Sequence, residues 1–213
     1  MNKEIFKKYP RNFRRGFELL EKGKTEKGIK RIEKSVDSGF KAGIVFLDLF
    51  RHSANASEAI DLFQTEYEQD FVKATLELGI KYYDGIDRQQ SFSDSVRFFL
   101  ESARAGGVEA CNYIGSMREK GEGLPLDTTK AFEWYERGAE RGDKVAKYNH
   151  GRLLYSGEGG YKDTDEAVDY WYASAKDGYL PAVCKVGEIF ELGLTVPVKL
   201  EKAYEWYLKA AME

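Results

Sequence analysis

Residues Ala110 to Val145 read ACNYIGSMREKGEGLPLDTTKAFEWYERGAERGDKV, and the same pattern then begins again. A second copy opens at Ala146 and a third at Ala182, each 36 residues after the one before. A fixed period of this length is typical of solenoids, which stack many small structural units. The stretch therefore predicts a repeat protein.

Each copy places glycines, an aromatic pair and small residues in the same slots. A glycine stands five residues after the opening alanine, a G-x-G turn follows in two copies, and an aromatic pair precedes a further alanine. The matching positions are Gly115, Gly151 and Gly187; Gly121/Gly123 and Gly157/Gly159; Trp134-Tyr135, Tyr170-Trp171 and Trp206-Tyr207; Ala139, Ala175 and Ala211. We interpret the three tryptophans as core packing residues.

The repeat can be followed toward the N-terminus. A fourth copy opens at Ala74, and two shorter, degenerate copies precede it within residues 1–73. The regular repeats therefore start at 74, 110, 146 and 182 and cover residues 74–213. We expect one repeat domain over residues 1–213, since no shift in composition indicates a second.

Each copy is expected to form two antiparallel helices. Asp127 and the threonines that follow it have the chemistry of a helix N-cap. Apolar residues then recur at three- and four-residue steps, which indicates a helix and not a strand. Gly142 ends this helix, because glycine readily adopts the left-handed conformation. The predicted fold is an all-α, right-handed α-α superhelical solenoid of about six helix-turn-helix repeats, with no sheet.

These slots resemble the Sel1-like repeat (SLR) family, which is related to the tetratricopeptide repeats. The resemblance is strong over residues 74–213 and weak over 1–73. It implies a concave face lined by the first helix of each pair, and a role in protein binding as an adaptor, scaffold or bacterial immunity protein. Some cysteine-rich members carry a disulfide in each repeat and have weak penicillin-binding activity. This chain lacks those cysteines, so that activity is not carried over.

Composition and motifs argue against other classes. Aromatic residues make up 14% of the chain, which has four prolines and no apolar run of the ~20 residues that a membrane span needs. We expect no secretory signal, because the N-terminal residues include basic ones but no apolar stretch. We also expect no metal and no cofactor, because the two histidines and two cysteines are far apart in the repeats. Glu136 and Glu140 share a helix face and could form an acid–base pair, but a solvated charged face is the simpler interpretation. A weak hydrolase of cell-wall or β-lactam type remains the enzymatic alternative.

Cys111 and Cys184 lie 73 residues apart, about two repeats. That separation exceeds the reach of a disulfide, so both are predicted to be free, buried thiols. Free thiols without a signal sequence favour a cytoplasmic location.

Charge is distributed unevenly. Residues 1–51 hold 14 Lys and Arg against 7 Asp and Glu, a net charge of +7, while the remaining residues carry −10. A basic end on an acidic chain can steer a partner electrostatically; the alternative is an ordinary solvated helix pair. We expect no nucleic-acid ligand, because the chain is net acidic and its aromatic and basic residues are not interleaved. We expect no membrane, because no apolar run is long enough to span one.

A candidate binding face follows from the register of the first helices. Three positions around each glycine slot fall on one helical stripe. From these positions we select as partner-binding residues Asp48, Arg51, Tyr83, Asn112, Ser116, Glu119, Tyr148, Arg152, Tyr155, Glu188 and Glu191; Cys184 occupies the same stripe. Tyr and Arg dominate interface hot spots, although the tyrosines could instead pack on the adjacent repeat.

The leading expectation is a non-enzymatic module that holds another protein or peptide in a helical groove. A second expectation concerns the last repeat, where Trp206, Tyr207, Ala210 and Ala211 would present an apolar face after the final aromatic pair. Either a second copy of the chain, giving a homodimer, or a partner would cover that face. A self-assembling structural protein is therefore the third class.

Overall fold

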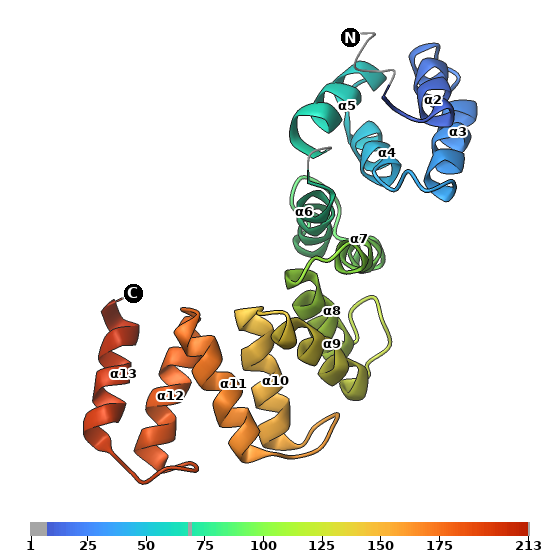
Figure 1. Cartoon of the computed structure of the whole chain (residues 1–213). Helices are drawn as coiled ribbons and strands as arrows, with labels where there is room; N and C mark the ends of the chain where they lie inside the picture. Colours follow the sequence, from blue (N-terminus) through green and yellow to red (C-terminus); the bar gives the residue numbers. More distant parts are fainter. Residues whose placement is uncertain (1–7, 68–69, 213) are drawn as a thin grey trace. The chain divides into compact units, whose positions relative to one another are not determined.

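The computed structural model describes residues 8–67 and 70–212, and the side chains of all these except Glu66 and Tyr67. These residues form twelve α-helices and one π-helical turn, with no strand among them. Consecutive helices pack as helix-turn-helix pairs (Figure 1). The all-α prediction and the expected number of about twelve helices are confirmed.

The helices divide into two compact units, Met1–Thr75 and Leu76–Glu213, which are described separately. The first unit contains α2 (Arg11–Glu21), α3 (Thr25–Asp37), α4 (Gly43–His52), α5 (Ala56–Leu62) and the turn η1 (Phe63–Tyr67), and α6 (Phe71–Asp84) begins at its end. The second contains the rest of α6 and α7 (Phe92–Arg104), α8 (Glu109–Lys120), α9 (Thr128–Glu140), α10 (Lys144–Ser156), α11 (Thr164–Lys176), α12 (Leu180–Leu192) and α13 (Leu200–Met212). One repeat domain over residues 1–213 stays a prediction.

The core of the first unit is built from phenylalanines. Phe13, Phe46 and Phe63 are fully buried. Their ring centroids lie 5.1 Å apart for Phe13 and Phe46 and 5.9 Å apart for Phe46 and Phe63, both in edge-to-face geometry, which aromatic quadrupoles favour. The pair α2–α3 closes around Gly16 and Gly28, where a Cβ on either glycine would lie 2.9 Å from the carbonyl oxygen of the other. Only glycine permits this approach.

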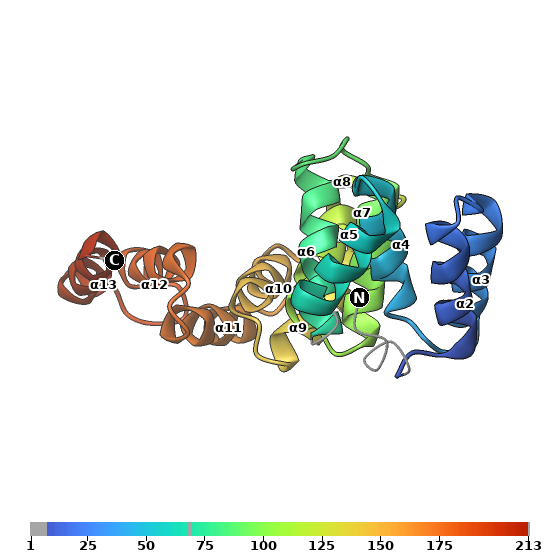
Figure 2. The same ribbon diagram turned by 90° about the horizontal axis from the view of Figure 1, so that it is seen from above.

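In the second unit, α10 to α13 follow one another in a row (Figures 1 and 2). The second helices begin at capped positions: the Asp127 carboxylate accepts from the Lys130 backbone N–H at 2.9 Å, and Asp163 does the same for Glu166. Gly142 has φ +99°, as expected for the residue that follows the helix end. The cap predicted at Asp127 is therefore confirmed.

Each G-x-G turn joins the two helices of one repeat and contacts the preceding repeat. Gly159 has φ +76°, and a Cβ there would overlap the carbonyl oxygen of Thr128, the first residue of α9 in the preceding repeat. Gly123 meets Phe92, the first residue of α7, in the same way. The second glycine of each turn therefore serves the contact with the previous repeat, in addition to its backbone conformation.

Two expectations about buried residues hold only in part, although Trp134 and Trp206 do pack against the core. Trp171 is 1% exposed, but Trp134 and Trp206 are only half-buried, because they fall in the first slot of the aromatic pair and Trp171 in the second. The fully buried counterpart of Trp171 is Tyr135. Cys111 is a buried free thiol as predicted, whereas Cys184 is free but exposed. Cys184 lies one position after the Cys111 slot, and this rotates it out of the core.

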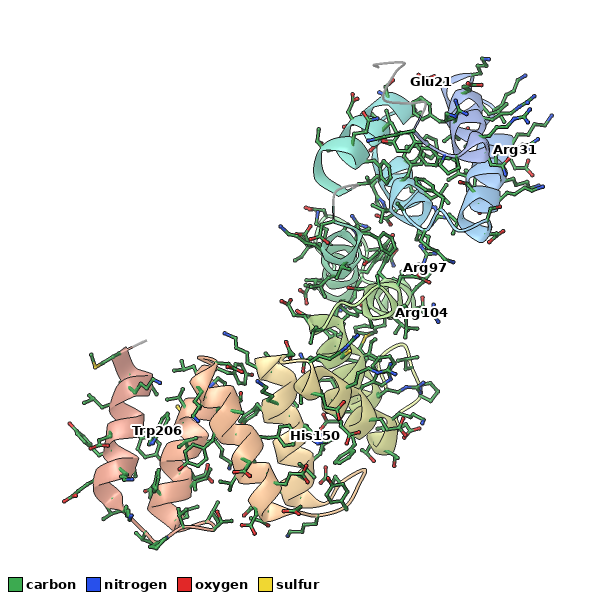
Figure 3. All side chains as sticks on the ribbon, viewed as in Figure 1. Glu21, Arg31, Arg97, Arg104, His150 and Trp206 are labelled. Atoms are coloured by element: carbon green, nitrogen blue, oxygen red, sulfur yellow. The ribbon has the colours of Figure 1, made fainter. Side chains whose placement is uncertain are left out.

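The last helix, α13, exposes a different set of apolar side chains from the predicted set. Trp206 packs toward the molecule, with its ring 6.1 Å from that of Tyr172 (Figure 3). Tyr207 lies against Gly187 of α12. The exposed apolar residues of α13 are Leu200, Tyr204, Leu208 and Met212. An exposed apolar stripe exists, but its residues differ from those predicted, except that Ala211 is also exposed.

Candidate functional site

The first helices α8, α10 and α12 belong to three successive repeats, and their side chains interact directly. Asn149 of α10 donates from its amide to the Asn112 oxygen of α8 at 2.8 Å. Further along the same two helices, Arg152 reaches Glu119. From α12, Lys185 lies over the Tyr155 ring of α10, with its ammonium 5.9 Å from the ring centroid. We call the surface formed by these side chains the first-helix face.

Glu119 is the most connected residue of this face. Nη2 of Arg152 lies 2.6 Å from one carboxylate oxygen of Glu119 and 2.7 Å from the other. The Tyr135 hydroxyl donates to the same carboxylate at 3.0 Å. Burial, reinforced by the nearby Glu119 charge, raises the pKa of Tyr135 well above its ordinary value. Ser116 is within hydrogen-bonding reach of the same phenol. The Glu119 carboxylate therefore joins two helices of its own repeat to the next repeat.

Tyr155 occupies the Glu119 slot one repeat later and makes a different contact. Its ring lies 5.5 Å from the Trp171 ring, the counterpart of Tyr135. The ammonium groups of Lys162 and Lys185 lie 5.8 and 5.9 Å from its centroid. An aromatic pair thus replaces the phenol–carboxylate hydrogen bond, and the cations add attraction to the ring faces.

The last repeat again has a hydrogen bond between a phenol and a carboxylate at these two slots. The Tyr207 hydroxyl donates to Glu191 at 2.7 Å, and this bond, with some burial, raises the pKa of Tyr207 to about 12. Beside it, Lys185 pairs with Glu188 at 2.8 Å. The first-helix face therefore carries charges of both signs, partly exposed and paired with one another.

Other predicted residues have different surroundings. The Tyr148 ring packs edge-to-face on Tyr179, with centroids 5.4 Å apart, so it contacts the turn before α12. The Tyr83 hydroxyl donates to Glu122 at 2.6 Å, and burial followed by this bond raises its pKa. In the first unit, Asp48 of α4 is fully buried, so it offers no open surface, while Arg51 is exposed near the end of the same helix.

The sequence prediction missed three residues of the first-helix face: Asn149, Lys162 and Lys185. Asn149 and Lys185 share one slot, two positions before the glycine, which lies outside the three-position stripe used for prediction. Lys162 comes from the turn before α11. The 37-residue spacing of Asn112 and Asn149, one repeat plus one residue, is the signal that could have indicated the amide pair.

The histidine of α10 lies in the core and not on this face. His150 is fully buried, with its ring 4.5 Å from Phe132 and 4.7 Å from Tyr170. Burial lowers the pKa of His150 to about 4. Within residues 8–67 and 70–212, no three His, Cys, Asp or Glu side chains gather as metal ligands would. Over the same ranges, no helix has both the length and the apolar character for crossing a membrane.

Comparison with known proteins agrees with this geometry. The chain matches the Sel1 repeat family over residues 7–25, 72–107, 108–143, 144–179 and 180–213. The chain belongs to the Sel1 repeat family, whose helix pairs it builds in tandem. The last four matched segments begin at residues 72, 108, 144 and 180, each 36 residues after the one before.

Solved structures show the same fold. A protective antigen of uropathogenic Escherichia coli with an SLR fold superposes with a TM-score of 0.65 at 22% identity, covering 86% of this chain and 40% of that one. A Sel1 repeat protein from Oxalobacter formigenes gives 0.63 at 23% identity, covering 79% and 69%. Human protein sel-1 homolog 2 is 24% identical over 198 residues. The chain spans 17% to 26% of the length of curated relatives such as this one.

Proposed function

We propose that this protein is a non-enzymatic interaction module that binds another protein, or an extended segment of one, on the first-helix face. The observation that carries the proposal is the run of partly exposed tyrosine, arginine, lysine and glutamate side chains across three successive repeats. Such side chains provide large contact area and directional hydrogen bonds. Solenoids present extended surfaces of this kind, because their repeats stack in one direction.

The contacts between repeats prepare this face for binding. Glu119 is held by Arg152 and by Tyr135, and Tyr155 is held between Trp171 and two lysines. Side chains that are already ordered lose less conformational entropy when a partner binds. A partner with both acidic and basic groups beside an apolar anchor would match the mixed charges of Arg152, Lys185 and Glu188.

Cys184 provides a direct test. It is exposed on α12, in the slot that Asn112 and Tyr148 occupy in the preceding repeats. Partners would first be captured by affinity purification from the native host and identified by mass spectrometry. Binding of a captured partner would then be measured before and after Cys184 is alkylated with a bulky maleimide. We expect alkylation to weaken binding at least tenfold. The Cys184→Ser protein should bind normally and resist the reagent. Unchanged affinity after complete alkylation would move the binding site away from this face.

Self-association is a second candidate, supported by the exposed stripe on α13. Leu200, Tyr204 and Leu208 recur at four-residue steps, and 66% of the Leu200 surface and 66% of the Tyr204 surface are exposed. We propose that a second copy of the chain covers this stripe to form a homodimer. Sedimentation equilibrium should give a dimer that Leu208→Glu dissociates, with Arg97→Glu as a control on another helix. A monomer at high concentration would exclude the dimer.

We also propose a cytoplasmic location, since both cysteines are free thiols. Labelling of the exposed Cys184 thiol can show in which compartment the protein lies. A maleimide that does not cross membranes should label it in lysed host cells but not in intact cells or in released periplasm. Labelling in the periplasmic fraction would contradict this location.

A further inference from the structure

The outer surface of the pair α2–α3 is strongly basic and is hollowed in two adjoining places. A pocket of about 380 Å³ is lined by Arg11, Arg14, Arg15, Glu18, Leu19 and Lys22. A second, of about 480 Å³, is lined by Arg15, Leu19, Lys27, Lys30, Arg31 and Lys34. Arg15 and Leu19 line both, so the pockets form one continuous surface, which we call the basic face. In Figure 3, side chains with nitrogen tips, Arg31 among them, project from this side of the pair.

Most of this positive charge is not neutralised by the residues that the structure describes. Among the described residues, Arg15, Lys27 and Lys34 take part in no ion pair, whereas Lys30 pairs with Glu26 at 2.8 Å. Nε of Arg14 is buried and finds no hydrogen-bond acceptor in the described part of the chain. A buried donor without an acceptor is costly, so this nitrogen leaves the positive charge of Arg14 without a partner among the described residues.

The cations are spaced like the residues of a helix-binding surface. Lys27, Arg31 and Lys34 fall at steps of four and three residues along α3, so they form a stripe roughly 10 Å long. Arg11 and Arg15 form a parallel row on α2, four residues apart. Carboxylates on one side of a partner helix recur at the same spacing.

We propose that the basic face binds an acidic helical segment of another protein, whose Asp and Glu side chains lie opposite these rows. The surface is separate from the first-helix face, since it belongs to the first unit. The observations favour a protein over the two other common polyanions. Both aromatic residues of α2 and α3, Phe13 and Phe17, are buried, so the face has no platform on which bases could stack.

The same burial argues against a membrane, since no aromatic residue of α2 or α3 is left to anchor in the lipid interface. Glu18 lies inside the first pocket and would repel a uniformly charged phosphate surface. A protein segment can place a basic or polar residue opposite Glu18 while its carboxylates meet the surrounding cations. The basic face therefore suits a ligand whose charges are interrupted.

The test measures binding of the full chain to a fluorescent 20-residue helical peptide with glutamates at i, i+4 and i+7, by anisotropy. The expected result is saturable binding that weakens as salt rises, as for any contact between exposed charges. A matched peptide with glutamine in place of glutamate should not bind. The triple variant Arg15→Gln, Lys27→Gln, Lys34→Gln should bind at least tenfold more weakly, since each exposed charge pair contributes a modest amount.

The control variant Arg141→Gln, Lys176→Gln, Lys199→Gln changes the net charge equally, at three exposed positions of the second unit. It should bind the acidic peptide within about twofold of the unmodified chain, and circular dichroism should show both triple variants folded. Equal binding by both triple variants would overturn the proposal, as would no binding of the peptide at all. Tighter binding of a 20-base-pair DNA duplex, or of phosphatidylserine vesicles, through the same three residues would replace a protein ligand with a phosphate one. Alkylation of Cys184 should leave peptide binding to the basic face unchanged. The proposal for the basic face and the proposal for the first-helix face can therefore be contradicted separately.

Discussion

The guanidinium of Arg152 in α10 holds both carboxylate oxygens of Glu119 in α8 through a single nitrogen, at 2.6 and 2.7 Å. The two residues are 33 positions apart and belong to successive repeats. Side-chain exposure is 37% for Arg152 and 25% for Glu119, so solvent screens the pair only in part. The ion pair therefore contributes to the stacking of repeats as well as to the surface that they present.

Replacing either member of this ion pair with alanine should lower stability, and the loss should be larger for Glu119 than for Arg152. Arg152→Ala should lower the free energy of unfolding by about 1 kcal/mol, the upper range for a partly exposed pair. Glu119→Ala should cost about 2 kcal/mol, because Tyr135 also loses the acceptor of its buried hydroxyl. Urea denaturation of both single variants and of the double variant gives their coupling. A coupling energy near zero would mean that the ion pair contributes nothing to stacking.

The G-x-G turn predicts a difference between two glycine substitutions. Gly142→Ala should cost about 1 kcal/mol, because it places a side chain at φ +99° but meets no atom within 4 Å. Gly159→Ala should cost at least about 2 kcal/mol more than that, because its Cβ would also overlap the Thr128 carbonyl. Thermal or chemical denaturation of the two variants measures the difference. Equal costs would show that the contact with the previous repeat relaxes freely.

Alanine substitutions in the two slots of the aromatic pair should also lower the free energy of unfolding by different amounts. Trp171→Ala should destabilise the chain by about 3–5 kcal/mol, as expected for a fully buried large side chain. Trp134→Ala should cost less, roughly half as much, because its side chain is partly exposed and loses less buried area. Unfolding free energies from denaturant titration provide the comparison. Similar losses would place both rings in equivalent environments.

His150 should make the chain sensitive to mild acid. Its pKa is lowered to about 4 in the folded chain, against about 6.5 when unfolded. The unfolded state therefore binds a proton first as pH falls, and stability declines between about pH 6.5 and pH 4, by about 3 kcal/mol in total. Ile114 and Val186 occupy the same slot in the neighbouring repeats and are buried. His150→Val should therefore remove this part of the pH dependence while keeping the stability at pH 7. The measurement is the unfolding free energy of both proteins across that range.

The fold was largely predictable because helix caps and helix ends depend on interactions between residues that are close in the sequence. Asp127 caps a helix and Gly142 follows one for reasons contained in a few residues on either side, so both positions could be assigned from sequence. The 36-residue period then extended each assignment to the other copies.

The surface was less predictable, because rotation about a helix axis depends on what packs around it. Cys184 lies one position from the Cys111 slot, which was enough to expose it. Asp48 follows the stripe by its spacing, yet it is fully buried in α4, a helix that packs on α3, α5 and η1. Lys185 and Lys162 reach Tyr155 from another helix and from a turn, and spacing within one helix carries no information about such contacts.

The Glu119–Arg152 pair also distinguishes correct from incorrect order among the repeats. Stacking that skipped residues 144–179 would bring α12 against α8 and place Glu188, the residue in the Arg152 slot, opposite Glu119. An attraction would become a repulsion between like charges, and Lys185 would take the place of Asn149 beside Asn112. Chains made of similar units are prone to such misassembly while they fold, and a penalty against the wrong neighbour is an effective safeguard. The charges on these first helices thus favour packing of each repeat on its native neighbour over packing on the repeat beyond it.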